Sequence, residues 1–105
     1  MSEARSRRIQ VAETSRPKLP RHVRLRFDEA RQRWVILAPE RVLAPDDIAV
    51  EILQHCDGER SVAEIIDLLA EKYVAARELI GADVLALLQD LADKGFLAEA
   101  REAAP

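Results

Sequence analysis

His55 and Cys56 are the only adjacent residues in the chain that could supply a thiol nucleophile and its base. The flanking residues have helical spacing, and neighbouring positions on a helix point about 100° apart, so the two side chains do not face each other. A free cysteine in such a segment usually packs as a small hydrophobic residue. We therefore interpret Cys56 as a core residue and His55 as a surface residue.

A second pair, Asp46 and Asp47, could hold a metal ion, but carboxylates directly before an apolar, helix-periodic stretch also suit a helix N-cap. One cysteine excludes an intramolecular disulfide, and the two histidines do not stand at ligand spacing from it. The three glycines, Gly58, Gly81 and Gly95, are too scattered to form a phosphate-binding loop. The sequence therefore predicts no metal, no cofactor and no enzymatic activity.

Length and composition limit the number of domains and the cellular location that the sequence allows. The chain of 105 residues has 49% hydrophobic and 33% charged residues, which is typical of one small folded domain with no room for a separate catalytic domain. Its longest apolar runs span four to six residues, whereas a membrane-spanning helix needs about 20. The Arg-rich start is not followed by an apolar stretch, so no secretion signal is indicated. We expect a cytoplasmic protein without membrane contact.

Charge is distributed unevenly along the chain. Residues 1–33 hold ten Lys or Arg against four Asp or Glu, a net charge of +6, whereas residues 34–105 hold six against fifteen, a net charge of −9. Such a division can steer a charged partner, although salt screens the field over about 8 to 10 Å. The same pattern also fits ordinary solvated faces.

Three strands are predicted first. Val23, Leu25 and Phe27 alternate with polar residues, which indicates a strand with one buried face. Residues 33–38 are apolar on both faces and form the central strand of the predicted sheet, while residues 40–44, between two prolines, form a short edge strand. Before them, residues 1–16 are a predicted mobile basic tail. The folded domain is expected over residues 17–98, with a C-terminal tail at 99–105.

Helical periodicity follows the strands. The first helix is predicted from Asp46 or Asp47 to a point before Gly58, with Ile48, Ile52, Leu53 and Cys56 on one face. Ser61 and Glu64 form a capping box that opens a second helix, whose apolar stripe is Val62, Ile65, Ile66, Leu69 and Tyr73. The third is expected over residues 83–94, followed by Phe96 and Leu97 folding back onto the core. This order predicts an α+β, winged-helix-like fold: a three-stranded antiparallel sheet followed by three helices.

This layout favours a binding module. The outer edge of residues 41–44 carries unpaired backbone groups that an extended peptide could pair with, and the third helix offers an apolar wall beside it. The chain's own tail or a second subunit could cover the same edge, so monomer and homodimer both stay open. A winged-helix nucleic-acid binder is the first alternative, but Asp83, Asp90 and Asp93 on the third helix would repel phosphates. The second alternative is a small-molecule carrier, for which so small a core leaves little room.

Four segments within residues 19–98 resemble the PqqD family, named for pyrroloquinoline quinone (PQQ) biosynthesis protein D. They are RLRFD at 24–28, RQRWVILAPE at 31–40, ILQHCDGERSV at 52–62 and DVLALLQDL at 83–91. LAPE and CDGER are the more specific parts, and the tail lies outside the resemblance. One departure is Gln32, where the family pattern leads us to expect a glycine.

The resemblance implies a protein without catalytic activity that binds PqqA, the ribosomally made precursor peptide of PQQ. It further implies that the peptide is presented to PqqE, a radical S-adenosylmethionine enzyme that cross-links a glutamate and a tyrosine within it. Similar domains hold a leader peptide between the third strand and the third helix. Carried over by position, the expected peptide-binding residues are Arg41, Val42, Leu43 and Ala44 on the strand and Val84, Leu85, Leu88 and Leu91 on the helix.

Overall fold

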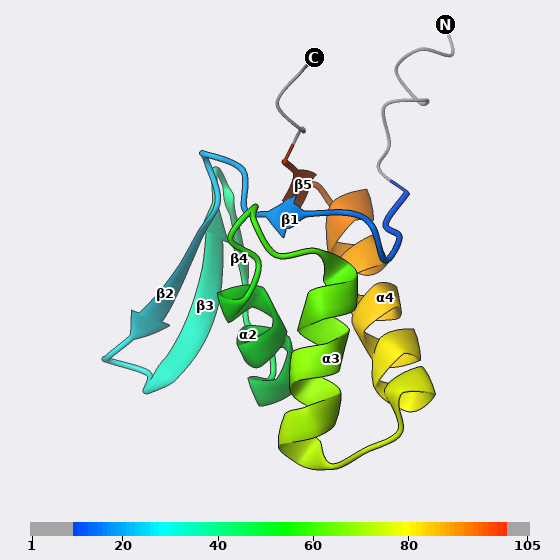
Figure 1. Cartoon of the computed structure of the whole chain (residues 1–105). Coiled ribbons are helices and arrows are strands. Elements are labelled where there is room, and N and C mark those ends of the chain that lie inside the picture. Colours follow the sequence, from blue (N-terminus) through cyan, green and yellow to red (C-terminus); the bar gives the residue numbers. More distant parts are fainter. Residues whose placement is uncertain (1–9, 101–105) are drawn as a thin grey trace, which may run out of the picture.

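The structure is a computed structural model that describes residues 10–100. Within this range the elements follow in the order β1 (Pro17–Lys18), β2 (Arg24–Asp28), β3 (Arg33–Ala38), β4 (Arg41–Leu43), α2 (Asp47–Gln54), α3 (Val62–Tyr73), α4 (Arg77–Asp93) and β5 (Ala98–Glu99). Figure 1 shows the β2–β4 sheet standing to one side of the three helices. The predicted fold class, three antiparallel strands followed by three helices, is confirmed.

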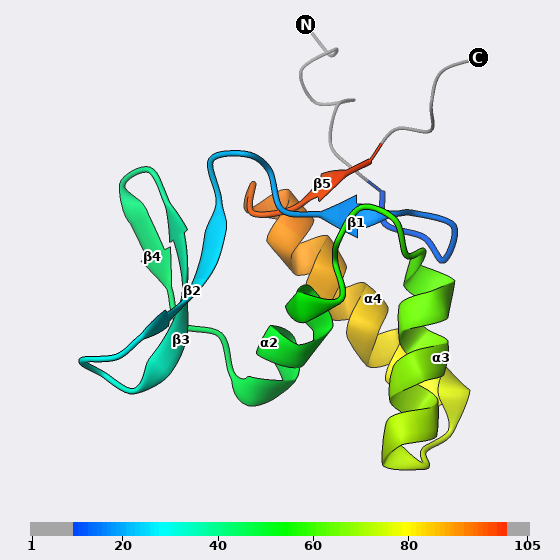
Figure 2. The ribbon, with the colours of Figure 1, turned by 60° about the vertical axis from the view of Figure 1, so that its left-hand side comes forward.

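The main sheet is antiparallel in the order β2-β3-β4, so β3 is the central strand and β4 an edge strand, as predicted. Ile36 of β3 is fully buried and belongs to the core. Phe27, which we expected on the buried face, is 40% exposed. It lies near the end of a hairpin that projects beyond the helices (Figure 2), where its ring packs edge-on against Trp34 with centroids 5.6 Å apart.

The turn of the β2–β3 hairpin explains the departure at Gln32. Gln32 has a φ of 56°, in the left-handed region that glycine adopts most readily. Its side-chain Nε2 donates to the backbone oxygen of Glu29 at 2.8 Å, which gives the turn some local support. The backbone here therefore has the conformation that suits the glycine expected from the family pattern.

We predict that Gln32→Gly stabilises the protein. A non-glycine residue in the left-handed region costs roughly 1 to 2 kcal/mol, and the substitution removes this cost. Glycine also increases the entropy of the unfolded chain, which offsets part of the stabilisation. The expected net gain is about 0.5 to 1 kcal/mol in the free energy of unfolding, measured by urea denaturation. Gln32→Ala serves as the control, because it removes the hydrogen bond to Glu29 but keeps the strained backbone. Equal stability of the glycine and alanine variants would contradict the explanation.

The helix starts follow their predicted caps. The Asp46 carboxylate accepts a hydrogen bond from the Ala49 N–H at 2.8 Å, so Asp46 is the N-cap of α2 and Asp47 is its first residue. Ser61 and Glu64 form the predicted capping box of α3, with hydrogen bonds of 3.2 and 2.9 Å. The caps thus account for the carboxylates that could have suggested a metal pair.

The start of α4 differs from the prediction. The helix begins at Arg77, six residues earlier than expected, so most of residues 75–82 is helical rather than a connection. Gly81 weakens the helical signal in the sequence, but in the fold it is buried where α4 meets α3. A Cβ there would lie 3.5 Å from Ile66 Cδ1, an ordinary van der Waals distance, so the packing of the two helices leaves room for a small side chain at this position.

Residues 10–16, the described part of the predicted tail, lie against the start of α3. The Ser15 and Glu13 carbonyls accept from the Val62 and Ala63 N–H groups at 2.8 and 2.9 Å, satisfying N–H groups of the first helical turn. The Arg77 guanidinium joins Glu13 to Asp67, at 2.9 and 2.5 Å. The boundary at residue 16 and the mobility of the tail stay predictions, and residues 1–9 and 101–105 lie outside the described range.

A second, two-stranded sheet, which the sequence did not predict, closes the fold near the chain ends. β1 pairs with β5 through Pro17 with Glu99 and Lys18 with Ala98 (Figure 1). Phe96 and Leu97 directly before β5 are buried, as predicted. The main core comprises Val23, Ile36, Ile52, Leu53, Cys56, Val62, Ile65, Ile66, Leu69, Val84, Leu88, Leu91, Phe96 and Leu97. None of the helices described is long and apolar enough to span a bilayer.

Candidate functional site

The edge strand β4 offers an open row of backbone groups. It pairs with β3 through Ala38 with Arg41, Leu37 with Val42 and Ile36 with Leu43, and no strand within residues 10–100 pairs with its other edge. The connecting turn consists of Pro39 and Glu40, and Glu40 has a φ of 63°, as a type II turn requires at its third position.

Such a turn is closed by the N–H of Arg41 donating to the carbonyl of Ala38. Hydrogen-bonded and non-hydrogen-bonded pairs alternate along an antiparallel ladder, so Val42 falls in a pair that is not hydrogen-bonded. Its N–H and C=O therefore point away from β3, toward the open edge. The Val42 side chain is 65% exposed. This residue is the best-placed one in β4 for pairing with an added strand.

Arg41 links β4 to the C-terminal end of α4. Its Nη2 donates to the backbone oxygen of Lys94 at 2.7 Å, which satisfies a carbonyl at the helix end. Its guanidinium carbon also lies 4.3 Å from the centroid of the buried Phe96 ring. Arg41 thus holds the start of the edge strand against the helix, although the two elements are far apart in the sequence.

The other predicted site residues differ in exposure. On the strand side Leu43 is half-buried and packs on the core, and Ala44, just beyond β4, is exposed. On the helix side Leu85 is half-buried, whereas Val84, Leu88 and Leu91 are buried in the core. A buried side chain presents little surface to a ligand, so these last three shape the helix more than they offer contact area. Peptide binding by the eight residues stays a prediction.

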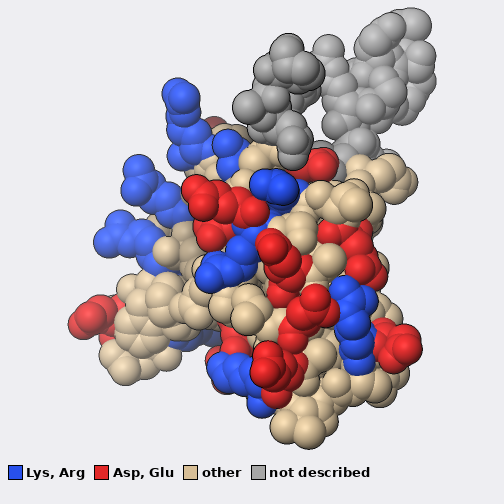
Figure 3. Space-filling view, viewed as in Figure 1, with Lys and Arg blue, Asp and Glu red and all other residues tan. Residues whose placement is uncertain are grey.

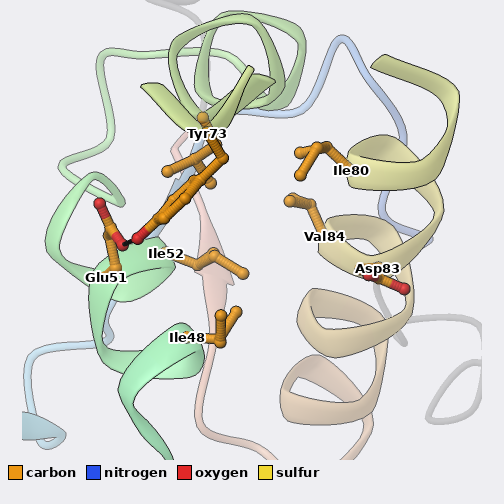
Figure 4. A pocket seen from close by; sticks show the side chains of 8 residues that line it. Ile48, Glu51, Ile52, Tyr73, Ile80, Asp83 and Val84 are labelled. Carbon is orange, nitrogen blue, oxygen red and sulfur yellow. Dashed lines mark hydrogen bonds between the residues drawn. The ribbon is translucent and has the colours of Figure 1, made fainter. Parts of the chain in front are cut away.

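A pocket between α2, α3 and α4 provides apolar surface that the sequence did not reveal. Its volume is about 110 Å³, and its lining residues are Ile48, Glu51, Ile52, Leu69, Tyr73, Ile80, Asp83 and Val84. Figure 4 shows Ile48 and Ile52 of α2 facing Ile80 and Val84 of α4 across the pocket. An apolar cavity of about 150 Å³ can bind benzene, so this one is large enough for an aliphatic side chain.

The prediction that Ile48 and Tyr73 belong to the core was wrong. Both have the spacing of buried helix positions, but both are exposed, Ile48 at 57%. They lie at the pocket, where α2, α3 and α4 leave space between them. Exposed apolar residues around a hollow are a usual sign of a binding surface. Periodicity alone could not distinguish them from core residues.

Glu51, which lines the pocket, forms hydrogen bonds through its carboxylate with two side chains of α3. Its carboxylate accepts hydrogen bonds from Lys72 Nζ and from the Tyr73 hydroxyl (Figure 4 shows the latter). The Lys72 bond is the main reason that the pKa of Glu51 lies below its usual value, with Tyr73 adding to the effect. The same bonds raise the pKa values of Lys72 and Tyr73. The carboxylate of Glu51 is therefore already occupied, and most of the other lining residues are apolar.

Cys56 is a core residue, as predicted. It is buried and its Sγ donates to the carbonyl of Ile52 at 3.4 Å. Burial, with a smaller contribution from Asp57, raises the pKa of the thiol to about 12. His55 is half-buried and caps the C-terminus of α2. The His55–Cys56 pair therefore supplies no nucleophile.

We expect Cys56 to react very slowly with thiol reagents in the native protein. A pKa raised from 9.0 to about 12 lowers the thiolate fraction at neutral pH by roughly a thousandfold, and only the thiolate attacks. At pH 7.5 the native protein should be alkylated by iodoacetamide at least a hundredfold more slowly than the protein unfolded in urea. Equal rates would mean that the thiol is accessible in the fold. Cys56→Ser should leave peptide binding intact.

The fold and the open edge together define a class: a small winged-helix-like domain whose edge strand stands beside its last helix. Among residues 10–100 no group of three or more His, Cys, Asp or Glu residues is placed to hold a metal ion. The family model described as "Coenzyme PQQ synthesis protein D (PqqD)" matches residues 33–97. The chain belongs to the PqqD family.

Two relatives match most of this chain. It is 78% identical over 100 residues to a "PqqA binding protein" of Rhodopseudomonas palustris strain HaA2, covering 95% of this chain and 98% of that protein. It is 48% identical over 81 residues to the "Bifunctional coenzyme PQQ synthesis protein C/D" of Methylorubrum extorquens, covering 77% of this chain and 22% of that longer protein.

Solved structures agree with the fold. The NMR structure of the PqqD part of Methylobacterium extorquens PqqCD has a TM-score of 0.72 and 44% identity, covering 84% of this chain and 94% of that one. That protein is described as a functional, stand-alone recognition element for ribosomally synthesized and post-translationally modified peptides. The crystal structure of Xanthomonas campestris PqqD has a TM-score of 0.52 and 42% identity, covering 81% and 94%.

Proposed function

We propose that this chain is a peptide chaperone of PQQ biosynthesis that binds the precursor peptide PqqA and presents it to the radical S-adenosylmethionine enzyme PqqE. The observation that carries the proposal is the open edge of β4, with Val42 exposed and its backbone groups directed outward, in a member of the PqqD family. The relative named as a PqqA binding protein supports the choice of peptide. A cytoplasmic location and the lack of enzymatic activity belong to the same proposal.

In this mechanism the peptide binds as an additional strand. Its backbone pairs with the outward N–H and C=O of Val42, which fixes its register, and its side chains provide the selectivity. Ile48 follows Ala44 by four residues in the chain, and the proposal takes the pocket as the end of the peptide's path from the open edge. An apolar side chain of the peptide enters this pocket and contacts Ile48 and Ile80.

The proposed site contains both predicted and added residues. It consists of Arg41, Val42, Leu43, Ala44, Val84, Leu85, Leu88 and Leu91, to which the pocket adds Ile48, Tyr73 and Ile80. Arg41 positions the strand through its hydrogen bond to the Lys94 carbonyl and its cation–π contact with the Phe96 ring. In this proposal the protein contributes no nucleophilic thiol to the peptide, since the only cysteine is buried with a raised pKa. Chemistry on the peptide then belongs to the partner enzyme.

An NMR titration of isotope-labelled protein with synthetic PqqA tests the proposal. We expect amide shifts on residues 41–45 and 83–91, joined by Ile48 and Ile80 at the pocket. Binding only in the presence of PqqE would reduce the role to that of an adaptor. No binding with or without PqqE would refute the proposal.

Neither alternative class gains support from the fold. The exposed residues of α4 include Asp83, Asp90 and Asp93, which would repel a nucleic-acid backbone. Pockets that enclose small ligands usually measure about 300 to 1,000 Å³ and are mostly apolar. The apolar pocket here has about 110 Å³, and two hollows of about 350 Å³ are shallow and lined in large part by charged residues. A peptide site needs only enough space for single side chains.

A further inference from the structure

The face of the sheet that points away from the helices carries arginines. Residues directly opposite each other in an antiparallel pair share a face. Arg24, Arg26 and Asp28 of β2 stand opposite Leu37, Val35 and Arg33 of β3, and Val42 of β4 continues this face. The other face holds the fully buried Ile36. We call the face with the arginines the outer sheet face. The helices stand to one side of the sheet (Figures 1 and 2), and Ile36 in the shared core shows that they cover the other face.

Three arginines on the outer sheet face have no partner among residues 10–100. Arg24, Arg26 and Arg33 are exposed, and none forms a hydrogen bond or ion pair with another residue in the described range. Most other described basic side chains are bound: Arg31, Arg60, Lys72, Arg77 and Lys94 form ion pairs, and Arg41 binds a helix end. Figure 3 shows basic side chains projecting on the side of β2, whereas acidic ones gather over the helices.

The outer sheet face also offers apolar surface between its charges. A shallow hollow is lined by Arg26, Asp28, Val35 and Leu37 of this face, together with Phe27 and Glu29 near the hairpin turn. Val35 itself is buried, so the half-buried Leu37 provides the apolar surface within this face. Val42, with its 65% exposed side chain, extends the apolar surface to the open edge of β4. Protein interfaces commonly have an apolar centre and a polar rim. Charged groups at the rim pair with opposite charges of the partner.

We propose that the outer sheet face docks an acidic surface of the protein that receives the peptide. Three arginines without an ion pair among residues 10–100, against the single carboxylate of Asp28 on the same face, favour a negatively charged partner and speed its approach. A peptide bound along β4 would widen this same face by one strand, so a partner docked there touches carrier and peptide together. The inference rests on the proposed function, because it places the receiving enzyme next to the bound peptide.

Charge reversal tests the docking surface, with purified PqqE as the probe. The double variant Arg24→Glu/Arg26→Glu should bind PqqE at least about tenfold more weakly than the parent at 50 mM salt. The parent's affinity should fall as salt rises to 500 mM, and the variant's should change much less. The matched pair is Arg26→Glu against Arg60→Glu, which alter the net charge equally; Arg60 stands outside the outer sheet face and pairs with Asp57.

Peptide binding is measured in parallel, so that the two proposals fail separately. If Arg24→Glu/Arg26→Glu binds PqqA like the parent but has lost PqqE affinity, the docking surface is supported. If the variant binds both like the parent, or if Arg60→Glu loses as much PqqE affinity as Arg26→Glu, the docking surface is refuted while the peptide site stands. If no form binds PqqA, the proposed function itself fails.

Two further measurements test whether the outer sheet face binds a second copy of this chain or nucleic acid instead. They are analytical sedimentation and duplex-DNA binding. The parent chain alone should show the same mass as Arg24→Glu/Arg26→Glu across micromolar concentrations. A dimer that the charge reversal dissociates would identify the outer sheet face as a contact between copies of this chain and overturn the proposal. Binding of duplex DNA by the parent, lost in the variant, would assign the face to nucleic acid and overturn it as well.

Discussion

Val42→Pro is expected to weaken PqqA binding by about tenfold to a hundredfold while leaving the fold intact. The Val42 N–H points to the open edge of β4 rather than to β3, so proline removes a donor that only the peptide would use. The peptide carbonyl that this donor serves would be left unpaired, at a cost of about 1 to 3 kcal/mol. Isothermal calorimetry with synthetic PqqA measures the loss, and circular dichroism checks the fold.

Two neighbouring substitutions serve as controls for this effect. Val42→Ala shortens the same side chain but keeps the N–H, so it should retain most of the affinity. Leu43→Pro removes a donor of the pair facing Ile36 and should lower the stability of the protein itself. Parent-like affinity in Val42→Pro would refute strand addition. If Val42→Ala fell as far as the proline variant, the side chain rather than the backbone would account for binding.

Local signals predicted the elements well because each acts within a few residues. Pro39 and Pro45 delimit the edge strand, Asp46 caps α2, and Ser61 with Glu64 caps α3. These groups satisfy backbone hydrogen bonds at an element end whatever the rest of the chain does. The open edge of β4 was predictable for the same reason, since a short strand bounded by prolines suits a sheet edge.

Features that depend on distant contacts were not predictable. In the first turns of α4, Gly81 is buried against Ile66 of α3, and the link from Arg41 to Lys94 and Phe96 joins residues more than fifty positions apart. The burial of Leu88 and Leu91 in the core likewise depends on how α4 settles against the other elements. Helical periodicity assigns a residue to a face but does not show whether the neighbouring helix covers that face.

The pocket between α2, α3 and α4 shows most clearly that helical periodicity cannot tell which apolar residues a neighbouring helix covers. Ile48 and Tyr73 have the spacing of core residues, and only the packing of three helices leaves them beside a cavity. Nothing within either helix distinguishes them from Ile52 or Leu69, which share their stripes and are buried. Exposed apolar residues at this location cost solubility without adding stability, which is reasonable if a ligand covers them.

Ile48→Asp is therefore expected to lower PqqA affinity by about tenfold or more with little change in stability. Burying an apolar side chain contributes about 1.5 to 3 kcal/mol, and a carboxylate at the pocket would deny the peptide that contact. Ile48 is 57% exposed and lies in the first turn of α2, where an acidic residue favours the helix dipole. Calorimetry with PqqA measures the affinity, and urea denaturation measures the stability.

The matched control is Leu68→Asp, which places the same charge on α3 at an exposed apolar residue outside the pocket. Because Leu68 does not line the pocket, its variant should bind PqqA like the parent. An equal loss of affinity in both variants would point to net charge rather than pocket contact. If Ile48→Asp keeps full affinity while Val42→Pro loses it, the peptide uses the edge of β4 but leaves the pocket empty, and Ile48, Tyr73 and Ile80 drop out of the site.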